Sequence, residues 1–250
     1  IIRATGICWN QVVCKGMARN KGISLKQKYR YFIGTICLYF RANIYYHISM
    51  KKYMIQSERL DLLLHECEGI IQTFQVLNNG ISKSVFYAYV KERGLEQAAH
   101  GVYVSPDTWT DAMYLLHLRC GQAVFSHETA LFFHDLTDRE PLKYTITVRT
   151  GYNPSRLQED GFQVYTVKKD LHEIGIIAMQ TSFGHSVPVY DMERTICDLL
   201  RSRKNVEMQV FQDALKQYAK RKDKNLRMLM KYAAMFHVEN ILRPYLEVLL

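Results

Sequence analysis

The stretch GISKSVFYAYVKERGLEQAAHGVYV, residues 80–104, decides the fold that we predict for the first half of the chain. Ser82 is a favourable helix N-cap, and apolar residues then recur at helical spacing until Gly94. Glycine commonly follows the last turn of a helix because it tolerates a positive φ angle. The pattern therefore predicts a helix from Lys83 to about Arg93. Its inward face should carry Val85 or Phe86, Tyr89 and Val90.

The residues after Gly94 predict a small β-hairpin. Gly101 supplies a turn, the valines in residues 102–104 alternate with a tyrosine, and Pro106 ends the run. The hydrophobic period thus changes from helical to alternating within a few residues, which indicates two short strands directly after the helix.

Two short helical patterns precede this stretch. Residues 57–67 begin with Ser57 as an N-cap, and residues 70–79 run up to an Asn-Asn-Gly turn. The inward positions expected are Leu60, Leu63, Leu64 and Cys67 on the first helix, and Ile70, Phe74 and Leu77 on the second. Three short helices followed by a two-stranded ribbon are the element order of a winged helix-turn-helix, which places its third helix in the major groove of DNA.

The polar positions of the third helix are candidates for DNA contact. Small hydroxyl side chains and a lysine at a helix N-terminus allow close approach to base edges and phosphates. The DNA-binding residues that we predict, including two near the hairpin, are Ser82, Lys83, Ser84, Tyr87, Lys91, Arg93 and His100. A plain solvated face is the alternative, because residues 50–106 contain six basic and six acidic side chains.

The net charge of +9 lies mostly outside this region. Residues 1–49 contain eight Lys or Arg and no Asp or Glu, which leaves 25 basic against 24 acidic side chains in the rest of the chain. The longest apolar run there, residues 31–40, is too short to span a bilayer, and no sustained period is visible. We therefore expect residues 1–49 to be a non-native or disordered extension before Met50, with an organelle transit peptide as the alternative.

Residues 107–250 predict a second, α+β domain. Strict alternation in residues 143–150 indicates a strand, and residues 161–169, 175–183 and 187–191 indicate further strands. Ser126 and Asp191 are expected to be helix N-caps, and the chain is helical in pattern from Val206 onward. The predicted fold class is α+β: a winged helix-turn-helix in residues 50–106, then a domain with a small central sheet flanked by helices.

The second domain offers little for catalysis. His127, Glu128 and His134 do not match a zinc-binding His-Glu-x-x-His helix, because Leu131 stands where the second histidine would be needed. No Gly-rich phosphate loop, nucleophile motif or paired Cys motif occurs. We therefore expect no cofactor, no metal and no enzymatic activity, with a nuclease-like enzyme on the central strands as a remote alternative.

Two groups of charged residues in the second domain remain as site candidates. Glu193, Arg194 and Asp198 lie within two helical turns, and Arg194 can pair with Asp198 four residues on. A structural ion pair is the favoured interpretation, with a toxin- or nucleotide-related site as the alternative. Lys220, Arg221 and Lys222 belong to a basic run that is either a solvated face or a surface for nucleic acid or an acidic partner.

Residues 80–104 resemble the N-terminal winged helix of AbiEi-type antitoxins of bacterial type IV toxin–antitoxin systems. The family pattern is Gly-Ile-Ser-Arg, an aromatic or Leu in the helix core, a terminal Arg-Gly, then Leu-Glu and Arg-Gly-Val-Tyr. The matching residues are Gly80, Ile81, Ser82, Phe86, Arg93, Gly94, Leu95, Glu96, Gly101, Val102 and Tyr103. Lys83 and His100 replace two arginine-type positions, which weakens a phosphate contact or makes it pH-dependent.

Two later stretches extend the resemblance. AVFSHETALFFHDL (123–136) is similar to the family's Ser-His-Glu-Ser-Ala-Leu helix, and VPVYDMERTICDLL (187–200) to its Glu-Arg-Thr helix. The resemblance implies a bacterial cytoplasmic antitoxin that represses its own operon by binding operator DNA. It also implies that residues 107–250 counter a nucleotidyltransferase-like toxin without needing a stable complex. The alternative is a stand-alone DNA-binding regulator whose C-terminal domain senses a ligand or partner.

Overall fold

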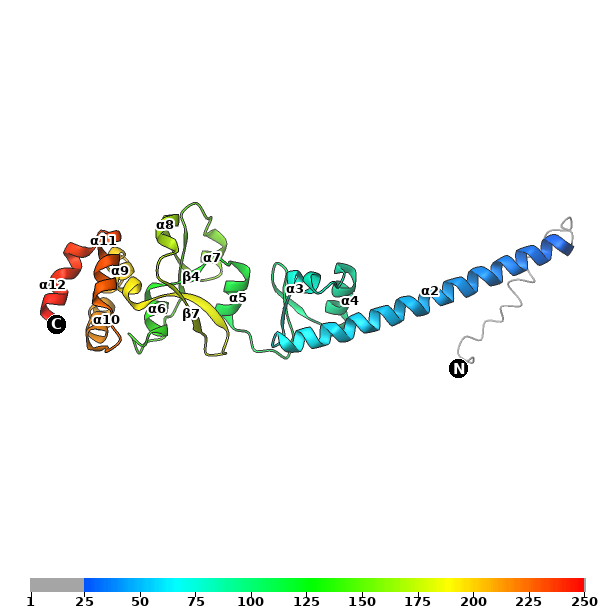
Figure 1. Ribbon diagram of the computed structural model, residues 1–250, viewed down its shortest axis with the longest axis horizontal. Helices are drawn as coiled ribbons and strands as arrows, with labels where there is room; N and C mark the ends of the chain where they lie inside the picture. The colour runs from blue at the N-terminus through cyan, green and yellow to red at the C-terminus, as the bar shows by residue number, and fades with distance from the viewer. Residues whose placement is uncertain (1–24, 250) are drawn as a thin grey trace. The chain divides into compact units, whose positions relative to one another are not determined.

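The computed structural model describes residues 25–249 of the chain, which form a mixed α+β protein (Figure 1). The first elements in chain order are α2 (Leu25–Glu66), β1 (Ile70–Gln72), α3 (Thr73–Asn78), α4 (Lys83–Arg93), β2 (Glu96–Ala99) and β3 (Val102–Val104). Next come α5 (Ala112–Arg119), β4 (Val124–Phe125), α6 (His127–Phe133), β5 (Thr145–Arg149), α7 (Ser155–Glu159), β6 (Gln163–Val167) and α8 (Lys169–His172). The last are β7 (Ile176–Gln180), β8 (Ser186–Tyr190), α9 (Met192–Arg201), α10 (Met208–Lys220), α11 (Leu226–Met235) and α12 (Glu239–Leu249).

The chain divides into two compact units. The first unit contains helices α2, α3 and α4. It consists of two segments of the chain, one that runs to Glu68 and a second over Phe74–Arg93. The second unit contains Gly69–Thr73 and everything from Gly94 onward, and therefore both sheets. The division does not follow the single boundary near residue 106 that we predicted, because β1 pairs with β3 across the intervening helices.

Helix α2 is much longer than the sequence pattern indicated. It runs without a break through 42 residues, so the predicted helix start at Ser57 is wrong. Residues 25–49, where no period was visible, lie in this helix, while residues 1–24 of the predicted extension lie outside the described residues. Ile44, Tyr45 and Tyr46 occupy consecutive positions and are all exposed, which explains why no amphipathic pattern was visible. Glu68 and Gly69 adopt positive φ angles after the end of the helix.

The segment predicted as a second helix is a strand followed by a shorter helix. Residues Ile70–Gln72 form β1, and α3 begins only at Thr73. Val76 is the buried residue of α3, whereas Phe74 is 69% exposed, so the predicted inward face is wrong there. Pairing of β1 with β3, thirty or more positions away in the sequence, overrides the local helical spacing.

The predicted helix Lys83–Arg93 and the hairpin that follows it are confirmed as α4 and as β2 with β3. Strand β3 is the centre of a three-stranded sheet of order β1-β3-β2, and all three of its residues are buried. Gly101 makes the turn with a φ of 74°. Helix α5 packs on this sheet through Tyr114, Leu115 and Leu118.

The larger sheet has five strands in the order β6-β5-β4-β8-β7, and the strands predicted from the sequence are confirmed. Strands β5 with β6 and β4 with β8 are parallel, and the other two pairs are antiparallel. Strand β5 alternates as expected. Its Ile146 and Val148 belong to a buried cluster with α5, whereas Thr145 and Thr147 face a buried polar layer on the other side.

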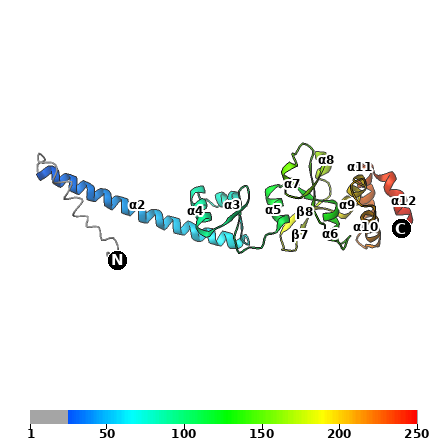
Figure 2. The same cartoon turned by 180° about the vertical axis from the view of Figure 1, so that it is seen from behind.

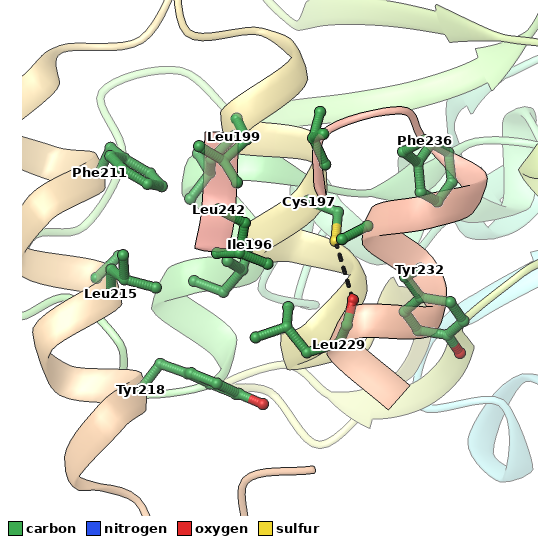
Figure 3. Close-up of a cluster of buried hydrophobic side chains, with 14 of the residues drawn as sticks. Ile196, Cys197, Leu199, Phe211, Leu215, Tyr218, Leu229, Tyr232, Phe236 and Leu242 are labelled. Carbon is green, nitrogen blue, oxygen red and sulfur yellow. Dashed lines mark hydrogen bonds between the residues drawn. The ribbon is translucent and has the colours of Figure 1, made fainter. Parts of the chain in front are cut away.

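A helical cluster completes the second unit. Helices α9 to α12 surround a buried apolar core that includes Ile196, Leu215 and Leu229 (Figure 3). The Cys197 thiol lies inside it and donates to the Leu229 carbonyl oxygen at 3.8 Å. Burial raises the pKa of this thiol, so it is a packing residue rather than a reactive one. No helix within the described residues is long and apolar enough to cross a membrane.

Candidate nucleic-acid interface

Helix α4 carries the polar face that we predict to contact DNA. Ser82, Lys83, Ser84, Tyr87 and Lys91 are all exposed. The hydroxyl groups of Ser82 and Ser84 lie 3.1 Å apart at the start of the helix, and the Val85 backbone N–H lies 3.5 Å from the Ser82 oxygen. The N-cap at Ser82 is therefore long and weak, which leaves its hydroxyl group able to turn toward another partner.

The opposite face of α4 is anchored on α2. Phe86 and Tyr89 of α4 and Leu60 of α2 are fully buried. The Tyr89 hydroxyl group donates to Asp61 at 2.6 Å, and Arg93 donates to the second oxygen of the same carboxylate at 2.6 Å. One carboxylate on α2 thus holds two side chains of α4, one turn apart.

The Asp61 contact also sets the chemistry of Tyr89. Burial and the carboxylate beside it raise the pKa of the Tyr89 phenol, because both disfavour the phenolate. A second contact lies further along α2, where the Tyr53 hydroxyl group donates to Glu92 at 2.6 Å. Glu92 is the single acidic residue of α4, and this hydrogen bond occupies one of its oxygens.

Arg93 differs from the other residues that we predicted for DNA contact. Its guanidinium group is half exposed but forms an ion pair with Asp61. Nearby Asp61 raises the pKa of Arg93 further, so the group stays charged and paired. Arg93 therefore helps to hold α4 against α2, and this pairing does not favour its predicted role in phosphate contact.

His100 lies in the turn of the β2–β3 hairpin and is exposed. The hairpin is irregular, since the β2–β3 register shifts between Gln97 and Ala99. A bulge of this kind increases local twist and redirects the side chains near the turn. His100 lies between the end of β2 and the start of β3, which places it at the tip of the hairpin, where the sequence predicts it.

The charged triplet in α9 is buried and structural. Arg194 and Asp198 are fully buried and pair through Nε and a carboxylate oxygen at 2.8 Å. The Arg194 guanidinium group also donates to the carbonyl oxygens of Leu171 and Ile174. It is stacked between the rings of Tyr190 and Phe236, whose centroids lie 4.3 and 4.0 Å away. This agrees with the structural ion pair favoured from the sequence.

Glu193 has a similar structural role. Its carboxylate accepts hydrogen bonds from the Tyr218 hydroxyl group at 3.0 Å and from the backbone N–H of Asn225 at 2.8 Å. These contacts join α9 to α10 and to the start of α11. Asp191 caps α9 by accepting from the Arg194 N–H, as predicted. All three side chains of the triplet are therefore buried within the helical cluster.

The basic run at the end of α10 is only partly free. Arg221 forms two hydrogen bonds with Asp223 at 2.8 Å, which neutralises its charge locally. Lys220 and Lys222, the other two candidates, are exposed. Arg221 is therefore paired within the chain, whereas Lys220 and Lys222 are accessible to a partner.

A buried histidine in α6 was not recognised from the sequence as a core residue. His127 begins α6 with a φ of 50° and is only 1% exposed. Its ring lies 3.0 Å from the Ser126 hydroxyl oxygen, 2.9 Å from that of Ser202, and stacks on Tyr165 at 3.6 Å. Burial, with Arg201 and Arg194 nearby, lowers the pKa of His127 to about 3, so the ring is neutral. No group of three or more potential metal-binding His, Cys, Asp or Glu side chains occurs among the described residues.

Comparisons with known proteins show only distant likeness to solved structures. No protein-family model matches the chain. No curated protein matches it either. Among solved structures, the chain is similar to the crystal structure of the RV2827C protein from Mycobacterium tuberculosis, with 12% identity, 71% of each chain covered and a TM-score of 0.49. A likeness at this level assigns no function.

Proposed function

We propose that this protein binds DNA through a winged helix-turn-helix whose recognition helix is α4. The observation that carries the proposal is the division of α4 into two faces. One face is exposed and carries hydroxyl groups, a tyrosine and two lysines, while the other is fixed to α2 through Asp61. A helix that enters the major groove needs such a support, because ordering a mobile helix and its side chains on binding costs free energy.

The residue types on the exposed face fit contacts to a duplex. Lys83 and the Ser82 hydroxyl group lie at the N-terminus of an 11-residue helix, where the helix dipole favours a phosphate. Tyr87 and Lys91 lie one and two turns further along. These positions supply both phosphate contacts and groups that can reach base edges.

The proposed partner is operator DNA in the promoter of the protein's own operon. Binding of the full chain to a promoter duplex, followed by fluorescence anisotropy, tests this directly. Lys83→Ala and Tyr87→Ala should each weaken binding by about 1 to 3 kcal/mol, the range expected for loss of a specific contact. Promoter affinity unchanged by both substitutions would refute the proposal for α4.

The antitoxin role rests on the family resemblance of residues 80–104, 123–136 and 187–200. We propose that residues 107–250 counter a nucleotidyltransferase-like toxin, using exposed residues rather than the buried triplet of α9. Lys220 and Lys222 are accessible candidates for that surface.

Co-expression of the full chain with the toxin encoded beside it tests the antitoxin role. Growth should recover with the wild-type chain and also with Lys83→Ala, because the DNA-binding face is not needed for protection. A chain that binds its promoter but restores no growth would instead be a stand-alone regulator.

A further inference from the structure

Strand β7 is an exposed edge of the five-stranded sheet. It lies at the end of the strand order, opposite the edge near α7 and α8 (Figures 1 and 2). Its sequence, Ile-Ile-Ala-Met-Gln, contains no charge and no proline. Ile176 and Ile177 are 38% and 39% exposed, and four of the five residues are exposed. Proteins usually protect such an edge with lysine, proline or a covering loop, and β7 carries no such residue.

The backbone hydrogen bonds show which groups of β7 point outward. The backbone N–H of Asp191 donates to the carbonyl oxygen of Gly175, and the backbone N–H of Thr181 donates to that of His185. Both pairs are therefore hydrogen-bonded pairs that flank the β7–β8 ladder. In an antiparallel ladder such pairs alternate with non-bonded ones. Residues 177 and 179 therefore bond to β8, while Ile176, Ala178 and Gln180 direct their N–H and C=O groups away from it. Pro188, which has no N–H, lies opposite Ala178 and fits this alternation.

The side chains of β7 divide between the two faces of the sheet. Met179 packs against the buried cluster beneath α5, and Ile177 lies on the same face. Ile176, Ala178 and Gln180 occupy the other face. Both faces of the strand are therefore uncharged and carry apolar groups next to the open edge.

The hairpin that carries this edge is held in place. Asp111, before α5, accepts a hydrogen bond from the Thr181 hydroxyl group at 2.6 Å and contacts the His185 ring nitrogen at 2.9 Å. The His185 ring stacks on Tyr114 with centroids 4.2 Å apart. An edge fixed before association loses little conformational entropy when another strand pairs with it.

We propose that β7 is a self-association edge, at which a second copy of this chain adds its own β7 in antiparallel orientation. A twofold axis at Ala178 places each outward residue opposite another outward residue: Ala178 opposite Ala178, and Ile176 opposite Gln180. The three pairs form roughly six backbone hydrogen bonds, since each hydrogen-bonded pair exchanges two.

The strand sequence is complementary to itself in this register. Ala178, the smallest side chain of β7, lies on the axis opposite its own copy, so no bulky groups collide there. Ile177 lies opposite Met179 of the second copy, which removes exposed apolar surface on that face. No like charges face each other, because β7 has none. Phe183, 50% exposed in the turn after β7, extends the apolar surface beyond the end of the strand.

A five-residue strand spans only about 17 Å, so the interface is at the small end of specific interfaces. The dimer should therefore dissociate on dilution, with a dissociation constant on the order of micromolar to tens of micromolar. This inference is independent of DNA binding, and its test contains no DNA.

Sedimentation equilibrium of the full chain over about 1 to 300 μM tests the proposal. The wild-type chain should shift from monomer to dimer. Ala178→Pro removes an outward N–H and leaves the β7–β8 ladder intact, and Ile177→Lys places two charges near the axis. Each variant should weaken association at least tenfold.

Leu142→Lys is the matched control, because Leu142 is a fully exposed apolar residue outside the strands. It should dimerise like the wild-type chain. Circular dichroism verifies that each variant is folded, and Ile177→Lys decides the matter if Ala178→Pro does not fold. A wild-type chain that stays monomeric, or a dimer that both edge variants leave unchanged, overturns the proposal.

Discussion

His127 shows how the fold controls the charge of a single side chain. The ring is buried between two serine hydroxyl groups and stacked on Tyr165, and the positive charges of Arg201 and Arg194 lie nearby. Its pKa falls from an ordinary value of 6.5 to about 3 for this reason. The sequence identified His127 as the first residue of α6, but its burial depends on β6 and α9, which are distant in sequence.

The pKa of His127 predicts a pH-dependent stability. The unfolded chain binds a proton at His127 below pH 6.5 while the folded chain does not, so stability falls as pH falls from 6.5 toward 3. Between pH 7 and pH 5 this histidine should remove about 2 kcal/mol of unfolding free energy. Urea unfolding at both pH values measures the loss.

His127→Asn is the matched variant, because asparagine tolerates the positive φ angle at this position. The variant should be less stable at pH 7 but should lose about 2 kcal/mol less than the wild-type chain on going to pH 5. Equal losses in both proteins would show that His127 is not the group that titrates.

Asp61 determines the position of a whole element. Tyr89 is completely buried, and its hydroxyl group has Asp61 as its hydrogen-bond acceptor. The Arg93 pair is half exposed and contributes little by comparison. Loss of the carboxylate should therefore act mainly through the unsatisfied phenol of Tyr89.

Asp61→Ala should lower the opening free energy of α4 by about 1 to 2 kcal/mol, as amide hydrogen exchange of residues 86–93 would measure. Asp61→Asn keeps an acceptor for Tyr89 and should cost less than about 1 kcal/mol. Glu58→Ala removes another acid from the same helix and serves as the control. Exchange in α4 that is equally fast in the Asp61→Ala and Glu58→Ala variants would contradict the anchoring role.

The elements that sequence reasoning predicted correctly are those with local signals. Helix α4 has a serine before it and Gly94 after it, and β5 alternates between core residues and threonines. Strand β1 was not predicted, because it forms by pairing with the distant strand β3. The true start of α2 was not predicted either, because the first part of this helix has no amphipathic pattern in its sequence. Neither distant strand pairing nor a helix without an apolar stripe can be recognised from the local sequence pattern.

The candidate site was predictable to a similar extent. Exposure of Ser82, Lys83 and Tyr87 follows from helical spacing around Phe86 and Tyr89. The pairing of Arg93 with Asp61 does not follow, since it depends on how α2 and α4 cross. The same holds for Arg221, whose charge is occupied by Asp223.

At the scale of the whole molecule, the proposed activities lie in different parts of the chain. DNA contact is assigned to the exposed face of α4, and self-association to the β7 edge of the second unit. Each can be removed by substitutions that leave the other unchanged. A repressor that pairs weakly through β7 would bind a twofold operator more tightly than a single half-site, since the second contact becomes intramolecular.

The affinity of the full chain for its promoter duplex, measured with the α4 variants beside a control, tests the central claim most directly. Lys143→Ala provides the control because Lys143 is exposed and lies in the second unit. The account predicts that Lys83→Ala weakens binding about fivefold or more and lowers the salt dependence by about one phosphate contact, while Lys143→Ala changes neither. Equal affinities for the two variants, both matching the wild-type chain, would contradict it.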